Sequence, residues 1–413
     1  MDYEKKSSLP QSRRKFIKNL ACAASSAAVS SLKPLFVQGT GAHRIKKGDM
    51  YYRRLGKTNL FVSEISLGGS PIPEDPILYK AFERGVNYID TSHDYMNGNS
   101  ERKIGKLCTD VGRGNIYVAT KFHIRGKWDA QSIIDSVNGS LQRLKSDYID
   151  VLLIHGAENE TDLTEERVIS AFEKLKKEGK YRFRGLSCHS NHHRVVKRAV
   201  ECGYYDMIQL AYNVFDIQEA ERDIKVYDDY LGESGIRHLI SLAHSKDVGI
   251  IAMKTLKVGG RRQNLDRYKT GTTSLLQAML KWVLENENVT SAVTEMLSFE
   301  QLEEDLSAVG NPLSASERKN LFRFVAENSH NYCHLCGLCQ SSCPARVKTT
   351  TILQVLAYYE NYGKEIAAKR AYSQLKPRHT ALSCLNCGEC ERECPYRVSV
   401  RMRIREAQRV LSA

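Results

Sequence analysis

Apolar runs of four to eight residues alternate with amphipathic segments along most of the chain. Eight such runs lie between residues 60 and 310, at 61–67, 87–90, 116–120, 148–155, 183–187, 207–212, 248–253 and 289–293. Helix-patterned segments separate seven of them; in one segment Val168, Phe172 and Leu175 recur at spacings of four and three. Strands that alternate with helices in this way predict a parallel (β/α)8 TIM barrel, which we place at residues 50–315.

The other architecture that fits this alternation is a doubly wound open sheet. Such a sheet commonly carries a Gly-x-Gly-x-x-Gly turn after its first strand, because glycine lets the backbone approach a bound pyrophosphate. No turn of this kind follows the first apolar run. The barrel is therefore the preferred prediction.

Two cysteine runs near the C-terminus share one spacing. Cys333, Cys336, Cys339 and Cys343 are followed by proline, and so are the four cysteines at 384, 387, 390 and 394. This is the bacterial ferredoxin run, in which the last cysteine of each run binds the other cluster. We predict two [4Fe–4S] clusters, with the ligands listed here: Cys333, Cys336, Cys339 and Cys394 for one, and Cys384, Cys387, Cys390 and Cys343 for the other.

Zinc is the alternative metal that Cys-x-x-Cys pairs bind. A zinc site needs neither a third cysteine at the same spacing nor a following proline, so iron and sulfide are preferred. Between the two runs, residues 350–373 have a helical pattern, and another helix is expected at 398–411. The module at residues 325–413 therefore resembles the helical ferredoxin-like two-cluster domains.

The first 42 residues form a leader. Arg13 and Arg14 precede Phe16, and a mild apolar stretch rich in alanine and serine runs from 20 to 37. This resembles a twin-arginine export signal, which moves proteins already folded around their cofactors. We expect a periplasmic or otherwise exported protein; the alternative is a cytoplasmic protein with a disordered basic tail.

Composition limits the kinds of binding partner and environment that we expect for this chain. The formal net charge is +13, but the basic residues are scattered rather than gathered into one tract, so no nucleic-acid partner is expected. No run reaches the roughly 18 apolar residues that a stable membrane span needs. The remaining cysteines, at 22, 108, 188 and 202, occur singly, which argues against a disulfide framework.

Polar residues follow three consecutive predicted strands, where barrel chemistry is found. These are Asp90, Lys121 and His155, with Tyr95 in the loop after Asp90. A tyrosine with a reference pKa near ~10 needs a neighbouring cation to release its proton, and Lys121 can supply that charge. Asp90 can hold the lysine by an ion pair, and His155 can donate a hydrogen bond to a substrate carbonyl.

These residues carry a resemblance to the aldo-keto reductases. The segment 85–92 with Tyr95, Gly98 and Glu101 looks like the second-strand signature of that family, and the likeness extends over residues 52–310. The tyrosine, aspartate, lysine and histidine on which catalysis depends in that family fall on Tyr95, Asp90, Lys121 and His155. The whole chain looks like the subgroup with a C-terminal ferredoxin-type domain.

The resemblance also implies a nicotinamide cofactor. Ser187 and Gln209 would contact its amide, and Glu304 and Asp305 would lie near the adenine. Lys254 stands close to the position at which an aromatic residue of the family would stack on the nicotinamide. His189 lies two residues after Ser187, in a segment where many members of the family have asparagine. We interpret His189, together with the histidines at 192 and 193, as a solvated helix cap rather than a metal site.

An NAD form is weakly favoured over NADP. The stretch 291–310 has no basic residue, and its carboxylates would repel a 2′-phosphate. Lys254 is the one nearby residue that could compensate.

Two hypotheses follow. The first is an oxidoreductase that acts on a small-molecule carbonyl/alcohol pair and exchanges electrons with a redox partner protein through the clusters. The second is an electron-transfer or binding protein whose barrel no longer performs hydride transfer. Nucleotide tightly retained by the purified protein would favour the first.

Overall fold

The computed structural model describes residues 44–124, 126, 128–216, 235–256, 265–329, 332–360 and 365–412. The chain divides into two compact units, Met1–Ala42 and His43–Ala413, and the described residues belong to the second. The predicted export leader therefore lies outside the described residues. Among those residues, none of the helices has both the length and the apolar character that crossing a bilayer requires.

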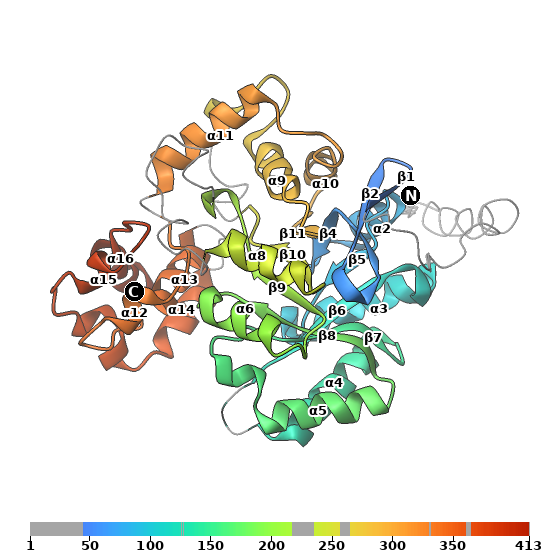
Figure 1. The fold of residues 1–413 in the computed structure, drawn as a ribbon, viewed down its shortest axis with the longest axis horizontal. Coiled ribbons are helices and arrows are strands. Elements are labelled where there is room, and N and C mark those ends of the chain that lie inside the picture. Colours follow the sequence, from blue (N-terminus) through green and yellow to red (C-terminus); the bar gives the residue numbers. More distant parts are fainter. Residues whose placement is uncertain are drawn as a thin grey trace, which may run out of the picture. The chain divides into compact units, whose positions relative to one another are not determined.

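The predicted barrel is confirmed. Within the described residues, eight parallel strands close in the order β10-β11-β4-β5-β6-β7-β8-β9 (Figure 1). Their bounds are β4 Ile65–Gly68, β5 Tyr88–Asp90, β6 Tyr117–Phe122, β7 Ile149–Ile154, β8 Tyr181–Cys188, β9 Met207–Ala211, β10 Gly249–Met253 and β11 Ser291–Thr294. Each strand therefore ends at the same rim of the barrel, where side chains from all eight can meet.

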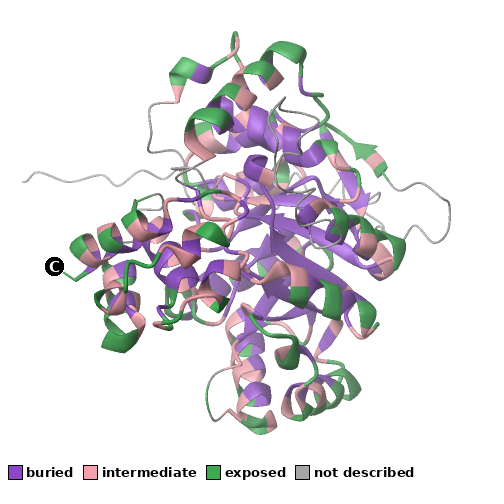
Figure 2. Ribbon diagram, turned by 60° about the vertical axis from the view of Figure 1, so that its left-hand side comes forward, coloured by how far each residue is buried: buried purple, intermediate pink, exposed green. Residues whose placement is uncertain are grey.

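Helices surround the barrel, with their apolar faces toward the strands (Figure 2). In the described residues these are α2 Asp75–Glu83, α3 Asn99–Val111, α4 Ala130–Leu144, α5 Glu166–Lys177, α6 His192–Glu201, α8 Ile236–Ser245, α9 Leu275–Glu285, α10 Phe299–Leu306 and α11 Ala315–Asn328. In α5, the apolar positions Val168, Phe172 and Leu175 are fully buried, as their spacing predicts.

The first predicted strand, 61–67, is in fact two strands. Phe61–Ser63 forms β3, which pairs antiparallel with β2 Met50–Arg54, and β2 pairs with β1 Arg44–Lys47. The break falls at Glu64, whose buried carboxylate accepts from Arg44 Nε at 2.6 Å and from Arg53 Nε at 2.7 Å. An apolar run cannot reveal this break, because it depends on partners 11 and 20 residues away.

The alternation of side chains in the strands fills the barrel interior. A buried cluster inside it contains Tyr88, Ala119, Val151, Leu153 and Met207. Because successive side chains of a strand point to opposite faces, the residues two further along also point inward. For these strands the next inward positions are, in order, Asp90, Lys121, His155 and Gln209.

The C-terminal module is helical. Its described helices are α12 Leu338–Ser341, α13 Thr349–Glu360, α14 Glu365–Ser373, α15 Glu389–Arg392 and α16 Val400–Leu411. The helix expected at 350–373 is thus described as α13 and α14, with residues 361–364 outside the described part. Ile352 and Leu356 of α13 form a separate apolar core with Ile404 and Ala407 of α16.

We predict that Gly185→Ala destabilises the barrel. A Cβ at Gly185 on β8 would lie 2.4 Å from Met207 O and 2.8 Å from Leu153 Cδ2, so the interior must shift to hold it. Overpacking of this kind lowers the free energy of unfolding by about 1–3 kcal/mol. Urea unfolding followed by circular dichroism measures it. The control is Gly114→Ala, whose Cβ would meet nothing within 4 Å; equal midpoints for both variants would contradict the prediction.

Candidate functional site

A buried ion pair lies at the rim of the barrel between β5 and β6. Lys121 Nζ is 2.5 Å from Asp90 Oδ1 and also donates to the carbonyl of Thr91 at 2.7 Å. Both side chains are almost fully buried. An unpaired charge here would be strongly unfavourable, so each partner holds the other in place. This is the pairing expected from the sequence.

Tyr95 enters the same site from the loop after β5. It begins the short helix η3 Tyr95–Gly98, in which Met96, Asn97 and Gly98 have φ values of 51°, 55° and 77°. Methionine rarely adopts a positive φ, so this turn is strained at Met96. The turn places the Tyr95 ring with its centroid 4.9 Å from Lys121 Nζ and 5.6 Å from the ring of His155.

Tyr95 keeps its proton in this environment. Burial raises the pKa of its phenol well above the usual value, and the charges of Asp90 and Asp94 add to the effect. Lys121, with Nζ over the face of the ring, is the neighbouring cation that can stabilise a phenolate once the proton leaves. A phenol of this kind is a proton donor that yields its proton only when negative charge develops on a neighbouring oxygen.

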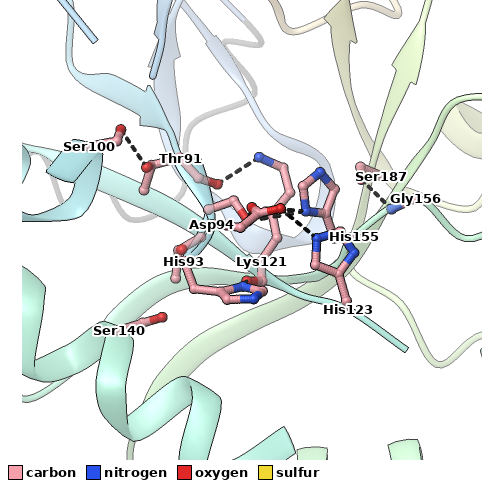
Figure 3. Close-up of polar contacts among 12 residues, drawn as sticks. Thr91, His93, Asp94, Ser100, Lys121, His123, Ser140, His155, Gly156 and Ser187 are labelled. Carbon is pink, nitrogen blue, oxygen red and sulfur yellow. Dashed lines mark hydrogen bonds and ion pairs between the residues drawn. The ribbon is translucent and has the colours of Figure 1, made fainter. Parts of the chain in front are cut away.

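Asp94 organises the histidines of the site (Figure 3). It accepts a hydrogen bond from Ser92 Oγ at 2.6 Å and one from His123 Nε2 at 2.9 Å. Burial acts to raise the pKa of Asp94, but the hydrogen bond from His123 and further favourable interactions outweigh it and hold the pKa far below its usual value. Asp94 is therefore ionised and can only accept hydrogen bonds.

This chain of contacts fixes the tautomer of His155. The single proton of Ser92 is donated to Asp94, so Ser92 Oγ must accept from His155 Nδ1, which lies 3.1 Å away. Burial, followed by the charge of Lys121, lowers the pKa of His155 well below its usual value, so the ring is neutral. With its one proton on Nδ1, the neutral ring has an unprotonated Nε2 that accepts a hydrogen bond. The donor role expected for His155 therefore does not fit this arrangement.

Three further histidines surround His155, and the sequence analysis did not assign them to the site. The ring of His123 stacks on that of His155 at 4.2 Å, His93 lies edge-on to His123 at 5.3 Å, and His189 is 6.1 Å from His155. The interpretation of His189 as a solvated cap is wrong, because its Nδ1 is buried and has no partner among the described residues. His123 could have been found, since it lies two residues after Lys121.

The C-terminal module also reaches this rim. Tyr358 of α13 lies with its ring 5.5 Å from Lys254 Nζ, and its proximity contributes to the raised pKa of Tyr95. Gln354 Nε2, one turn earlier, donates to the Tyr358 hydroxyl at 3.2 Å. No local pattern in the sequence could have predicted this, because Tyr358 and Tyr95 are far apart along the chain.

The two residues expected at a nicotinamide amide are both buried in the barrel mouth. Ser187 Oγ accepts from the backbone N–H of Gly156 at 2.9 Å and donates to Ile154 O at 3.3 Å. Gln209 Oε1 is buried without a hydrogen-bond partner among the described residues. A buried amide oxygen of this kind requires a donor, and the N–H of a carboxamide fits it.

The other expected cofactor residues do not lie together. Glu304 lines an open cavity with Ser298, Glu300 and Lys269. Asp305 is buried on the same helix, α10. Lys254 is not among the residues that line this cavity, and lies instead near Tyr358. Lys269 is the basic residue that the sequence analysis missed, because it lies before β11 in the chain.

The eight cysteines of the module line two cavities. Cys333, Cys336, Cys339 and Cys394 line one, and Cys343, Cys384, Cys387 and Cys390 line the other. Each cavity thus takes three cysteines from one run and the last cysteine of the other. This is the crossed arrangement that the ferredoxin spacing predicts.

The two runs adopt the same backbone. Gly337 and Gly388 have φ values of 88° and 84° and immediately precede α12 and α15. Only glycine adopts such a conformation without strain, which explains its place in both runs. The backbone N–H groups of Leu335 and Asn386 lie 3.4 Å from Cys333 Sγ and Cys384 Sγ. Such donors stabilise thiolates that bind a cluster.

The sulfur spacing argues against zinc. A tetrahedral zinc site with bonds of about 2.3 Å holds its sulfurs roughly 3.8 Å apart. Among the described residues, the one trio of potential metal ligands within 4.8 Å of one another is Asp94, His123 and His155, so no three cysteine sulfurs are that close. A [4Fe–4S] cubane separates its thiolates more widely and fits these cavities.

Burial raises the pKa of the Cys390 thiol to about 12 and also raises that of Cys339. Without a metal these thiols would be neutral, and bound iron would be needed to keep them as thiolates.

Comparison with known proteins identifies both parts of the chain. The family model described as Aldo/keto reductase family matches residues 74–324, and the 4Fe-4S dicluster domain matches residues 329–398. The uncharacterized oxidoreductase YqkF of Bacillus subtilis is 28% identical over 294 residues, which cover 63% of this chain and 91% of YqkF. L-galactose dehydrogenase of Arabidopsis thaliana is 28% identical over 293 residues, which cover 62% of this chain and 87% of that protein.

Among solved structures, the holo form of aldo-keto reductase AKR11C1 from Bacillus halodurans aligns with a TM-score of 0.53 at 25% identity, over 66% of this chain and 95% of that one. An aldo-keto reductase from Klebsiella pneumoniae in complex with NADPH aligns with a TM-score of 0.52 at 21% identity, over 66% of this chain and 94% of that one, and shows the shared fold. The family match extends over more than half of the 413 residues and includes the buried pair and Tyr95. The chain therefore belongs to the aldo/keto reductase family of oxidoreductases and carries a C-terminal 4Fe-4S dicluster domain.

Proposed function

We propose that the barrel interconverts a small-molecule carbonyl and its alcohol with a nicotinamide cofactor, and that Tyr95 holds the transferred proton. The observation that carries this proposal is the buried Lys121–Asp90 pair beneath the Tyr95 ring. When bound, the nicotinamide supplies or accepts the hydride. Its fit rests on Gln209 Oε1, a buried acceptor that lacks a donor among the described residues.

The residues around Tyr95 have separate roles in this proposal. Tyr95 donates its proton to the carbonyl oxygen as negative charge develops there, and Lys121 stabilises the phenolate that remains. Asp90 keeps Lys121 charged and in position. These groups act in reverse for the alcohol, with the phenolate accepting the hydroxyl proton.

His155 supports a substrate that carries a hydroxyl group. Its neutral ring has the proton on Nδ1, committed to Ser92, so Nε2 accepts rather than donates. A carbonyl oxygen cannot use an acceptor, whereas a hydroxyl can. We therefore propose a hydroxylated carbonyl compound or its polyol, with the carbonyl at Tyr95 and a neighbouring hydroxyl at His155.

The C-terminal module is proposed to hold two [4Fe–4S] clusters that pass single electrons to or from a redox partner protein. The crossed cysteine sets and their wide sulfur spacing support this stoichiometry. The alternative, an electron-transfer or binding protein, shares the clusters and the arrangement of residues around Tyr95 but performs no hydride transfer. Export through the twin-arginine route stays a prediction, since the leader lies outside the described residues.

We predict that Tyr95→Phe abolishes carbonyl reduction and leaves the fold intact, because only the transferable proton is removed. The assay is the oxidation of NADH or NADPH with glyceraldehyde and other small hydroxylated carbonyls. Tyr79→Phe, which alters a half-buried tyrosine on α2 whose hydroxyl donates to Asp110, away from the barrel mouth, is the control. A Tyr95→Phe variant that keeps more than about a tenth of the wild-type rate would remove Tyr95 from this role.

We predict that the anaerobically purified protein contains about eight iron atoms per chain, and that Cys387→Ser lowers this number because one thiolate ligand is lost. Iron, sulfide and zinc analysis measures it. Cys202→Ser is the control, since Cys202 lies on the barrel side and lines neither cysteine cavity. Stoichiometric zinc without iron would refute the proposal.

We predict that the barrel does not strongly prefer the 2′-phosphorylated nucleotide. Glu300 and Glu304 line the cavity beside α10 and would repel a phosphate dianion, while Lys269 is the basic residue that opposes them. Fluorescence titration with NADH and NADPH measures the preference. A preference for NADPH beyond about tenfold, or ~1.4 kcal/mol, that disappears in Lys269→Ala would show that Lys269 outweighs the carboxylates.

A further inference from the structure

The two cysteine cavities differ in their surroundings. The cavity of Cys333, Cys336, Cys339 and Cys394, named here the inner site, lies beside barrel segments. His334 Nδ1 is 3.2 Å from Asp216 Oδ1, and the backbone N–H of Asn191 donates to Leu335 O at 3.0 Å. The cavity of Cys343, Cys384, Cys387 and Cys390 is named the outer site. Of the eight cysteines, all of which are described, Cys387 is the one that is exposed.

Exposed apolar side chains gather at the outer site. Leu382 and Leu385, on either side of Cys384, are 73% and 69% exposed, and Leu385 lines the cavity itself. Met402, next to the cavity residue Arg401, is 56% exposed. These three account for nearly half of the large exposed apolar residues in the described part of the chain. Apolar side chains concentrated in one place mark a surface that another molecule covers.

Basic side chains surround these apolar residues. Two of these arginines contact His379, in the segment before Leu382. His379 Nδ1 donates to the backbone carbonyl of Arg346 at 3.0 Å, and Arg378 Nε lies 3.3 Å from His379 Nε2. Arg405 Nη2 donates to Asn386 Oδ1 at 2.9 Å, beside Cys387. Among the described residues, none of Arg346, Arg378 and Arg405 forms an ion pair, and all three are exposed.

The nearby carboxylates cancel only part of this charge, because Glu393 is a single exposed carboxylate and the Arg405 charge acts on Glu391 without forming an ion pair with it. Glu391 is held by Arg401 at 2.6 Å, and Glu389 pairs with Arg392. Both are thus neutralised by other arginines. The segments that form the outer site thus carry three exposed apolar side chains and three exposed arginines that form no ion pair among the described residues.

We propose that Leu382, Leu385 and Met402, with Arg346, Arg378 and Arg405 around them, form the docking surface for an acidic one-electron carrier protein that exchanges electrons with the outer site. An apolar centre with a charged edge suits a transient complex, because opposite charge steers the encounter and the apolar contact orients it. The inference rests on the proposed function in that it requires a [4Fe–4S] cluster in the outer site.

The electron step is balanced without a proton or a new bond. Held by Cys343, Cys384, Cys387 and Cys390, an outer [4Fe–4S]²⁺ cluster would take up one electron to become [4Fe–4S]⁺, while a reduced [2Fe–2S]⁺ carrier would become [2Fe–2S]²⁺. The same surface serves the opposite direction when the carrier arrives oxidised. Exposure of Cys387 brings a cluster ligand to the protein surface, where a carrier can approach it closely.

The test measures electron transfer from a reduced plant-type [2Fe–2S] ferredoxin, an acidic carrier, to the iron-loaded full-length protein by stopped-flow spectroscopy. We expect Arg378→Glu and Leu385→Glu each to lower the second-order rate at least about tenfold at low salt, with the wild-type rate falling as salt rises. Arg370→Glu and Ile366→Glu, which alter exposed residues of α14, are the matched controls and should keep the wild-type rate.

Reduction by dithionite and iron content are measured for every variant. The proposal is supported when Arg378→Glu and Leu385→Glu keep the wild-type dithionite reduction and iron content and only their reduction by ferredoxin is slower. Wild-type ferredoxin rates in iron-loaded Arg378→Glu and Leu385→Glu would overturn the docking surface and leave the proposed function standing. Equal losses in the α14 controls, or equally fast reaction with basic cytochrome c as acceptor, would also overturn it. Protein with zinc and no iron would overturn the proposed function itself.

Discussion

The residues of the eight barrel strands that face the barrel interior determine which side chains can meet at the rim. Successive residues of a strand point to opposite faces, so the buried Tyr88, Ala119 and Leu153 oblige Asp90, Lys121 and His155 to point inward as well. Closure of the barrel then brings the three strand ends to one rim. The Lys121–Asp90 pair is the consequence with the largest energetic weight, because two charges removed from water must compensate each other.

Beside this pair, the carboxylate of Asp94 determines which nitrogen of His155 carries the proton. Asp94 takes the Ser92 proton, Ser92 accepts from His155, and the neutral imidazole is left with an acceptor nitrogen. The usual expectation that such a histidine donates to a carbonyl assumes a different proton arrangement. The direction of one hydroxyl proton, decided by an ionised neighbour, therefore decides whether His155 Nε2 donates or accepts a hydrogen bond.

The module and the barrel are connected by α13. Its first residue, Thr349, lies with Oγ1 3.2 Å from Cys339 Sγ, and Tyr358 in its last turns approaches Lys254 and Tyr95. Nine helical residues rise about 14 Å, so one short helix extends from the cysteine cavities to the barrel mouth. The inner and outer sites thus have distinct neighbours: the barrel for one, and an exposed apolar and basic surface for the other.

Local patterns in the sequence were enough to predict the barrel, the two cysteine sets and the order of Asp90, Tyr95, Lys121 and His155, because periodicity and spacing are properties of neighbouring residues. They did not reveal the break at Glu64, which depends on Arg44 and Arg53, or the proximity of Lys269 to Glu304. They also could not assign the proton of His155 or bring Tyr358 to Tyr95. Only the tertiary structure decided these features, because each is set by the distance between groups that the chain brings together from separate segments.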